Sequence, residues 1–191
     1  MINLYEMCKT DIRKLNTVLN TFQYGTVEHG KIVELHEKFH TLPLSSVLRY
    51  KCGCCWELSL LEATYFSLYI PKIKYQLWYC QNQRYETHAW LSYVDEQGNT
   101  VTFESAWHDY QGLHVFKTEK EMMETYYKKL AASWDYDPKP FFMATFALFT
   151  ANRLTPWQFM NIALTNSTFK YGSFELYKKV KQELATSDHE V

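Results

Sequence analysis

The sequence predicts an α+β fold. Apolar residues recur at helical spacing near both ends of the chain, and nearly every position from 55 to 68 is apolar or small. Between these helical patterns lie short segments rich in β-branched and aromatic residues, two of them joined by a turn signal. Consecutive strands flanked by groups of helices are typical of α+β folds, because strands that follow one another directly tend to pair antiparallel.

Helical spacing predicts two helices in the N-terminal quarter, at 9–22 and 29–40. Segment 42–46 then predicts a loop, since Pro43 disfavours the helical conformation in the residue before it and two serines follow. A helix that is hydrophobic all round is one that other elements surround. We therefore expect residues 55–68 to form the central helix of the domain.

Strands are predicted at 73–80, 86–94 and 100–104, where apolar, β-branched and aromatic residues concentrate. Residues 95–99 read Asp-Glu-Gln-Gly-Asn, a turn composition that joins the last two strands. These segments therefore predict an antiparallel hairpin with a neighbouring strand.

Capping signals place the C-terminal helices. Thr118 precedes two glutamates and predicts a helix that runs to about 132, where residues 135–138 break it. Segment 141–149 fits either a strand or a buried helix, because periodicity alone does not separate the two. A cap followed by a first-turn proline at Thr155-Pro156 predicts another helix, and Ser173 opens the last one, to about 185.

Length and composition limit the function classes. The 191 residues suit a single domain, and 20 basic against 21 acidic residues leave no cationic excess, so we expect neither nucleic acid nor membrane as a partner. The longest apolar stretch is too short to cross a bilayer, and the first residues lack a secretion signal. Five cysteines, an odd number, are typical of reduced thiols. We expect a cytoplasmic protein.

The segment Gly53-Cys54-Cys55-Trp56-Glu57 carries the strongest chemical signal. If Cys55 begins the central helix, the positive end of the helix dipole favours its thiolate. Gly53 would let the chain turn sharply and leave room for a substrate carbonyl, and the backbone N–H of Cys55 could contribute to an oxyanion hole. The sequence therefore predicts Cys55 as a nucleophile.

His88 and Glu104 supply the other two parts of a catalytic triad. Even-numbered residues share one face of 86–94, and even-numbered residues share one face of 100–104. If the strands pair with 88 or 90 opposite 104, His88 and Glu104 are direct or diagonal neighbours, whereas a slip by one residue separates them. In the productive register Glu104 orients His88, and His88 exchanges a proton with Cys55.

These fragments resemble the transglutaminase-like cysteine hydrolase superfamily, a branch of papain-like folds. The similar features are a glycine two residues before a cysteine that an aromatic follows (Gly53, Cys55, Trp56), a His-Ala-Trp strand from His88, and an acid one strand later (Glu104). The third member in that family is more often aspartate. The resemblance implies a papain-like core at about 45–115 within a single domain of residues 1–191, with the central helix packed on an antiparallel sheet and helical flanks at 1–44 and 116–191.

The same resemblance implies acyl transfer through a thioester, either to water or to an amine, and we expect hydrolysis of a peptide or amide. The substrate would be a peptide or protein, and no cofactor would be needed. Four aromatic residues lie near the expected site in sequence, and we expect them to bind substrate: Trp56, Trp90, Trp107 and Tyr85.

Two rival interpretations use other residues. His36-Glu37-x-x-His40 matches the pattern of zinc peptidases, in which two histidines one helical turn apart hold the metal and the glutamate activates water. Glu57 or Glu62 would then have to supply a third ligand. The pair Cys52-x-x-Cys55 is also compatible with half of a zinc site or with a redox pair. A further alternative is a catalytically silent member of the fold that binds a protein partner.

Overall fold

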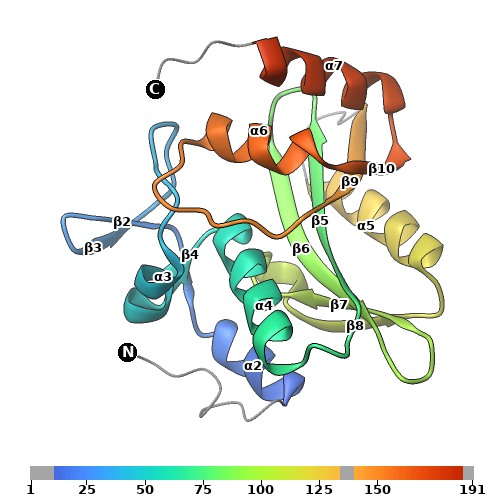
Figure 1. Cartoon of the computed structure of the whole chain (residues 1–191), viewed down its shortest axis with the longest axis horizontal. Coiled ribbons are helices and arrows are strands. Elements are labelled where there is room, and N and C mark those ends of the chain that lie inside the picture. The colour runs from blue at the N-terminus through green and yellow to red at the C-terminus, as the bar shows by residue number, and fades with distance from the viewer. Residues whose placement is uncertain (1–10, 134–139, 187–191) are drawn as a thin grey trace.

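A six-stranded antiparallel sheet organises the molecule (Figure 1). The computed structural model describes residues 11–133 and 140–186. Along the sheet the strand order is β10-β9-β5-β6-β7-β8, and every neighbouring pair is antiparallel. The strands span Tyr75–Asn82 (β5), Thr87–Val94 (β6), Thr100–Glu104 (β7), Gly112–Phe116 (β8), Phe141–Phe146 (β9) and Thr168–Gly172 (β10).

Helices and two small pairs of strands complete the fold. The helices span Ile12–Leu19 (α2), Leu44–Tyr50 (α3), Cys55–Tyr69 (α4), Glu119–Ser133 (α5), Pro156–Thr165 (α6) and Phe174–Thr186 (α7), with a 3-10 turn at His108–Tyr110 (η1). One small pair is parallel, Gln23–Tyr24 (β1) with Cys52–Gly53 (β4), and the other is a hairpin of Thr26–Glu28 (β2) and Lys31–Val33 (β3). The predicted α+β class is confirmed.

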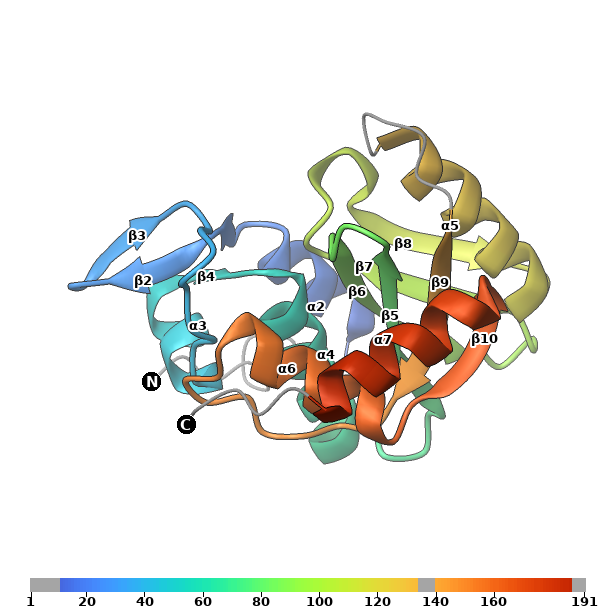
Figure 2. The same cartoon turned by 90° about the horizontal axis from the view of Figure 1, so that it is seen from above.

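The sheet is buried on both faces, and alternate residues of its strands explain why. In β5, Leu77 and Tyr79 belong to the cluster shared with α4, α6 and α7, whereas Trp78 and Cys80 belong to a second cluster shared with α5. Figure 2 shows α5 on one side of the sheet and the other three helices on the opposite side. A strand covered on both faces has no polar side, which accounts for the four consecutive apolar and aromatic residues from Leu77 to Cys80 in the middle of β5.

Helix α4 is the central helix, as predicted. Its residues are buried around most of its circumference, because the sheet lies on one side and other helices on another. Its first turn is fixed by the carboxylate of Glu57, which accepts hydrogen bonds from the backbone N–H groups of Cys54 (2.6 Å) and Leu42 (2.7 Å). The buried Glu57 thus satisfies the backbone N–H of the N-cap residue of α4 and ties the helix start to the segment that precedes α3.

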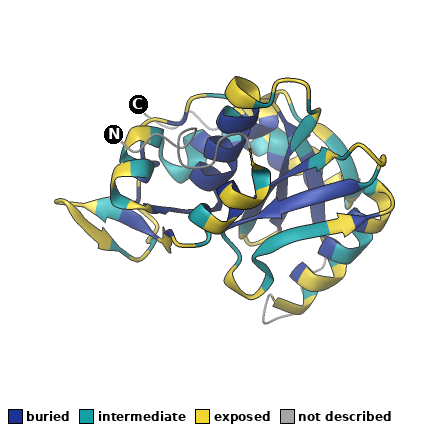
Figure 3. Ribbon diagram, turned by 90° about the horizontal axis from the view of Figure 1, so that it is seen from below, coloured by how far each residue is buried: buried dark blue, intermediate teal, exposed yellow. Residues whose placement is uncertain are grey.

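The predicted helix at 29–40 is wrong. His29 and Gly30 both have positive φ angles and form the two-residue turn between β2 and β3. Such a turn suits the twist of a hairpin and cannot belong to an α-helix. Figure 3 shows this hairpin projecting from the body with a largely exposed surface, and each of its strands has only three residues, which is too few for a clear strand signal in the sequence.

Other boundaries also differ from the predictions. Helix α3 begins at Leu44, inside the predicted loop 42–46, and Pro43 is its N-terminal cap. The flanks are not purely helical: within 1–44 the described residues form α2 and the β2–β3 hairpin, and the expected flank 116–191 supplies β9 and β10. Because β9 lies between β5 and β10, the sheet takes strands from outside the expected core limits of 45–115. Segment 141–149 thus contains a strand.

The capping signals and the turn predicted the remaining elements well. Gly98 takes a positive φ of 82° in the turn between β6 and β7. Thr118, Thr155 and Ser173 each accept a backbone N–H at the start of α5, α6 and α7. The predicted helix at 9–22 is observed as α2, although residues 9 and 10 lie outside the described residues, as do 135–138.

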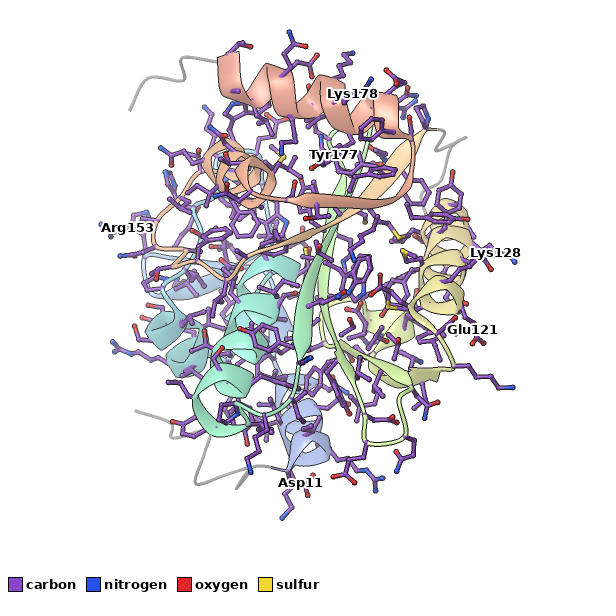
Figure 4. All side chains as sticks on the ribbon, turned by 45° about the vertical axis from the view of Figure 1, so that its right-hand side comes forward. Asp11, Glu121, Lys128, Arg153, Tyr177 and Lys178 are labelled. Carbon is purple, nitrogen blue, oxygen red and sulfur yellow. The ribbon has the colours of Figure 1, made fainter. Side chains whose placement is uncertain are left out.

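Helix α7 covers one end of the sheet with a two-sided surface. Figure 4 labels Tyr177, which points toward the sheet, and Lys178, which points away from it. Tyr177 is buried and packs on Phe142 of β9, whereas Lys178 is exposed. Among the described residues, no helix combines the length and apolar character needed to cross a bilayer.

Candidate active site

Cys55 is the first residue of α4, as the sequence predicted. Its side chain is buried, with 3% of the residue exposed, and it faces the N-terminal end of the helix, where backbone N–H groups and the helix dipole stabilise negative charge. The backbone N–H of Ala89 in β6 lies near enough to the sulfur to contribute to the lowered pKa of the thiol. These donors favour the thiolate over the thiol.

His88 and Glu104 are adjacent, because β6 and β7 pair in the productive register. Ser92 pairs with Thr102, so even-numbered residues face even-numbered residues, and continuing the ladder places position 90 opposite 104. His88 is then the diagonal neighbour of Glu104, and its Nε2 lies 2.8 Å from Oε2 of that carboxylate. The predicted cross-strand relationship is therefore confirmed.

The carboxylate of Glu104 is itself held in place. Its Oε1 accepts the backbone N–H groups of Ala106 (3.0 Å) and Trp107 (2.9 Å), and 1% of the residue is exposed. Because Oε2 contacts Nε2 of His88, the other ring nitrogen, Nδ1, is the one left to face Cys55. A buried, oriented carboxylate of this kind fixes both the tautomer and the position of the imidazole.

Cys55 and His88 meet at the point where β7 ends. Helix α4 packs on the face of β6 that carries Ala89 and Leu91, whereas Trp90 belongs to the cluster on the opposite face. The ladder between β6 and β7 begins at Leu91, so the first residues of β6 extend beyond it. In this open stretch the Cys55 sulfur lies close enough to the imidazole of His88 that each group is among the causes of the other's pKa shift, downward for Cys55 and upward for His88.

The neighbouring thiol of Cys54 contributes most to the acidity of Cys55. A hydrogen bond from Cys54, together with the hydrogen bond and charge of His88, lowers the pKa of Cys55 well below its ordinary value despite burial. Burial raises the pKa of Cys54, so that thiol keeps its proton and can donate it. The pair therefore consists of one thiolate and one thiol.

His88 is poised as a cation. Burial alone would lower the pKa of His88, but the carboxylate of Glu104 and the thiolate of Cys55 raise it to about 10. At neutral pH the site thus holds a thiolate and imidazolium pair stabilised by the buried carboxylate.

Tyr24 belongs to the site and was not predicted. Its hydroxyl donates toward the Sγ of Cys55 at 4.0 Å, while 53% of the residue as a whole is exposed. The charge of the Cys55 thiolate raises the pKa of the Tyr24 phenol, which therefore keeps its proton. Tyr24 pairs with Gly53 in the β1–β4 ladder, and this pairing brings the two segments together.

Two cavities adjoin the Cys55 and His88 pair, one lined by each residue. A groove of about 760 Å³ is lined by Cys55 and Trp56, and by Tyr85 from the turn between β5 and β6. A smaller cavity of about 200 Å³ is lined by His88 and Trp107. Tyr24 and Thr87 line both, so the two cavities adjoin at the reactive centre.

Three of the four aromatic residues expected to bind substrate line these cavities, and Trp90 does not. Only 1% of Trp90 is exposed, and its ring stacks on Trp78 and Tyr126 in the cluster beneath α5. Trp90 lies two positions after His88 in β6, so the two side chains share one face of the strand. Trp90 is farther from the end of the strand and is covered there by α5. Trp90 is a core residue.

The zinc alternative requires a helix at residues 36–40, and the structure has no helix there. His36, Glu37 and His40 lie outside any helix, so the two histidines are not placed one turn apart, and His36 instead bonds Glu28 at 2.6 Å. Glu62, one of the two acids considered as a further ligand, accepts a hydrogen bond from Ser105. Among residues 11–133 and 140–186, no group of three His, Cys, Asp or Glu side chains is arranged to hold a metal ion.

The Cys52-x-x-Cys55 pair is not the functional pair of thiols. Cys52 is fully buried and its Sγ lies 3.8 Å from the backbone oxygen of Thr26, away from the site. Burial raises the pKa of Cys52 to about 11. The thiol that interacts with Cys55 belongs to Cys54.

One of the two roles expected of Gly53 is not observed. It lies in β4 with no positive φ, so the sharp turn invoked for it is absent. A Cβ at this position would meet Val47 at 3.4 Å and the Glu57 side chain at 3.5 Å, which are ordinary contacts. The bend into α4 is stabilised instead by the Glu57 cap, a first-turn acid that capping rules could have identified from the sequence.

A third cavity, of about 630 Å³, lies away from the triad. Arg153, labelled in Figure 4, and residues of β2 and α3 line it. None of Cys55, His88 and Glu104 contributes to it.

Comparison with known protein families gives no match to this chain, and comparison with curated proteins gives none either.

Proposed function

We propose that this protein is a thiol-dependent hydrolase that cleaves an amide or peptide bond through a thioester acyl-enzyme. The observation that carries the proposal is the placement of His88, whose Nε2 lies 2.8 Å from Oε2 of Glu104 and whose imidazole lies near enough to the Cys55 sulfur to help lower the pKa of that thiol. A nucleophile, a base and an orienting acid in contact are the parts that acyl transfer requires.

Acylation begins with attack of the Cys55 thiolate on the substrate carbonyl carbon. The C–S bond forms as the carbonyl π electrons move to oxygen, and the backbone N–H of Cys55 and the Tyr24 hydroxyl are donors close enough to stabilise that oxyanion. The imidazolium of His88 then gives its proton to the departing nitrogen, the C–N bond breaks, and an amine leaves. The acyl group remains on Cys55 as a thioester.

Deacylation reverses these roles. Neutral His88 removes a proton from water, the oxygen attacks the thioester carbon, and the C–S bond breaks to return the thiolate and release a carboxylic acid. Glu104 stabilises the imidazolium in both halves of the cycle. An amine in place of water would give a new amide, so hydrolysis and amine transfer share the same acyl-enzyme.

The proposal agrees with the resemblance to transglutaminase-like cysteine hydrolases. The nucleophile at a helix start and the His and acid on neighbouring antiparallel strands are the features on which that resemblance depends. A glutamate at 104 reaches the imidazole while both its oxygens remain bonded, so the exchange of aspartate for glutamate does not remove the orienting contact.

Acylation by p-nitrophenyl acetate tests the proposal. The expected result is a burst of p-nitrophenol equal to the enzyme concentration and a mass increase of one acetyl group on Cys55, which hydroxylamine removes. Cys55→Ser and His88→Asn should abolish the burst, whereas Cys52→Ala, which changes a buried thiol outside the site, should retain it. Methylamine added during turnover reveals amine transfer as N-methylacetamide.

A protein without this activity would behave differently. If the wild-type chain gives no burst and its acetylation is spread over lysines, the thioester mechanism is wrong. A purely binding role would then remain.

A further inference from the structure

We infer that the groove beside Cys55 selects acyl donors with a bulky apolar side chain next to the reacting carbonyl and disfavours acyl donors that carry a carboxylate. The inference deepens the proposed function and rests on it. It concerns the substrate class of the same site.

The two cavities differ in which reactive side chain they contain. Cys55 lines the groove of about 760 Å³ but not the smaller cavity, and His88 lines the cavity of about 200 Å³ but not the groove. The leaving group must lie beside His88, because that imidazole protonates it, whereas the acyl group stays bonded to the sulfur. The groove is therefore on the acyl side of the scissile bond.

The walls of the groove are largely apolar. Trp56 forms part of the floor and is held rigid by parallel stacking on Phe159, with ring centroids 4.3 Å apart. Trp157 and Met160 of α6 line the groove, and Trp157 packs on Tyr85 at 5.6 Å between ring centroids. A concave apolar surface of this size accommodates a large aliphatic or aromatic side chain, because burial removes apolar area from water.

Carboxylates are the charged groups that dominate the lining of the groove. Glu37 and Glu86 line it and are exposed, none of the described residues that line it is lysine or arginine, and His36, which also lines it, already contacts Glu28 at 2.6 Å. A carboxylate entering this space would lose hydration without gaining a lysine or arginine partner and would approach two like charges. A neutral side chain of equal size avoids both costs.

Acylation by N-acetyl-aminoacyl p-nitrophenyl esters tests the inference. The rate constants for acylation of Cys55 are measured for the Gly, Leu, Phe, Gln and Glu esters, and each is divided by the rate constant of the same ester with N-acetylcysteine. Leu and Phe should exceed Gly by roughly tenfold to a hundredfold. Gln should exceed Glu severalfold, and this difference should shrink at high salt, because the opposing carboxylates are exposed.

Two variants on α6 locate the selectivity. Trp157→Ala should reduce the ratio of Leu to Gly rate constants by at least about fivefold, since an apolar wall is lost. Ile162→Ala removes an exposed side chain on the same helix, outside the groove, and should leave that ratio unchanged. Glu37→Gln should narrow the difference between Gln and Glu esters.

The outcomes separate the two proposals. Equal normalised rates for Gly, Leu and Phe, with Cys55 acylated by all, would overturn the groove assignment and leave the thioester mechanism standing. A Glu ester that reacts faster than its Gln counterpart would overturn the charge argument. Failure of every ester, Gly included, to acylate Cys55 would overturn both.

Discussion

The hydroxyl of Tyr24 lies 4.0 Å from the Sγ of Cys55, although 31 residues separate them in the chain. The contact depends on a two-residue parallel ladder in which Gln23 pairs with Cys52 and Tyr24 with Gly53. Because Gly53 leads directly into α4, the ladder ties the phenol to the nucleophile. The tyrosine also lines both cavities, so it stands at the point where a scissile bond would lie.

Replacing Tyr24 with phenylalanine separates two possible roles of its hydroxyl. If the hydroxyl stabilises the oxyanion, Tyr24→Phe should slow acylation by p-nitrophenyl acetate on the order of a hundredfold. Alkylation of Cys55 by iodoacetamide, which forms no oxyanion, should change by less than about threefold. Equal losses in both reactions would assign the hydroxyl to thiolate stabilisation instead.

Glu104→Gln should change the protonation of His88. The backbone N–H groups of Ala106 and Trp107 bind the oxygen of the new amide, so its NH₂ group faces Nε2 and forces that nitrogen to accept. His88 then carries its proton on Nδ1 and no longer serves as a base. Acylation should fall roughly a hundredfold or more.

The same variant should alter the titration of His88. The wild-type imidazole has its pKa raised to about 10, in large part by Glu104, so the imidazolium persists below that pH. Without the carboxylate the midpoint moves to lower pH, as NMR of the imidazole C–H signals can measure. Asp109→Asn, an exposed acid near the site, is the matched control, and an unchanged midpoint in Glu104→Gln would contradict the account.

Glu62 makes the stability of the protein depend on pH. Burial raises its pKa well above the ordinary value, so the native state keeps a proton that the unfolded state releases. The stabilisation is complete below the unfolded pKa and is lost as pH rises toward the folded pKa, at about 1.4 kcal/mol per pH unit.

Glu62→Gln should flatten that slope between pH 5 and 8 in urea unfolding, because the amide does not titrate. Its oxygen can still accept the hydroxyl of Ser105. Glu96→Gln, on the exposed turn between β6 and β7, should keep the wild-type slope. Identical slopes in all three proteins would show that Glu62 does not hold a proton in the folded state.

Gly53→Ala should be tolerated. The added Cβ meets its neighbours at 3.4 Å or more and the backbone has no positive φ, so the free energy of unfolding should stay within about 1 kcal/mol of wild type. Acylation should also continue at a similar rate. Loss of acylation in a folded Gly53→Ala variant would mean that the missing side chain serves the substrate carbonyl after all.

Local patterns predicted much of the fold. The apolar residues on all sides of 55–68 predicted α4. The threonine and serine caps predicted where α5, α6 and α7 begin, and the turn composition that includes Gly98 predicted the connection between β6 and β7. The apolar spacing at 29–40 predicted a helix, but His29 and Gly30 both have positive φ and form a hairpin turn. An α-helix cannot continue through two such residues. The order of the sheet, with β9 beside β5, depends on long-range packing that no local pattern encodes.

The part of the candidate site that could be predicted is the part that depends on which residues share a face of a strand. The period of two along β6 and β7 related His88 to Glu104 once the register was given. Nothing local related Tyr24 to Cys55, because their contact depends on a two-residue ladder. The burial of Trp90 could not be predicted from the sequence either, because it depends on the packing of α5 against the second face of the sheet.

The pH dependence of Cys55 alkylation tests the central claim most directly. In a Cys8→Ser background, which removes the cysteine outside the described residues, iodoacetamide is applied across the pH range and the labelled site is read by mass spectrometry. The account predicts rapid labelling confined to Cys55 that is already maximal at neutral pH, because hydrogen bonds from Cys54 and His88 lower the pKa of its thiol. A rate that instead rises with a midpoint at the ordinary thiol pKa of about 8.5, unaffected by His88→Asn, would contradict it.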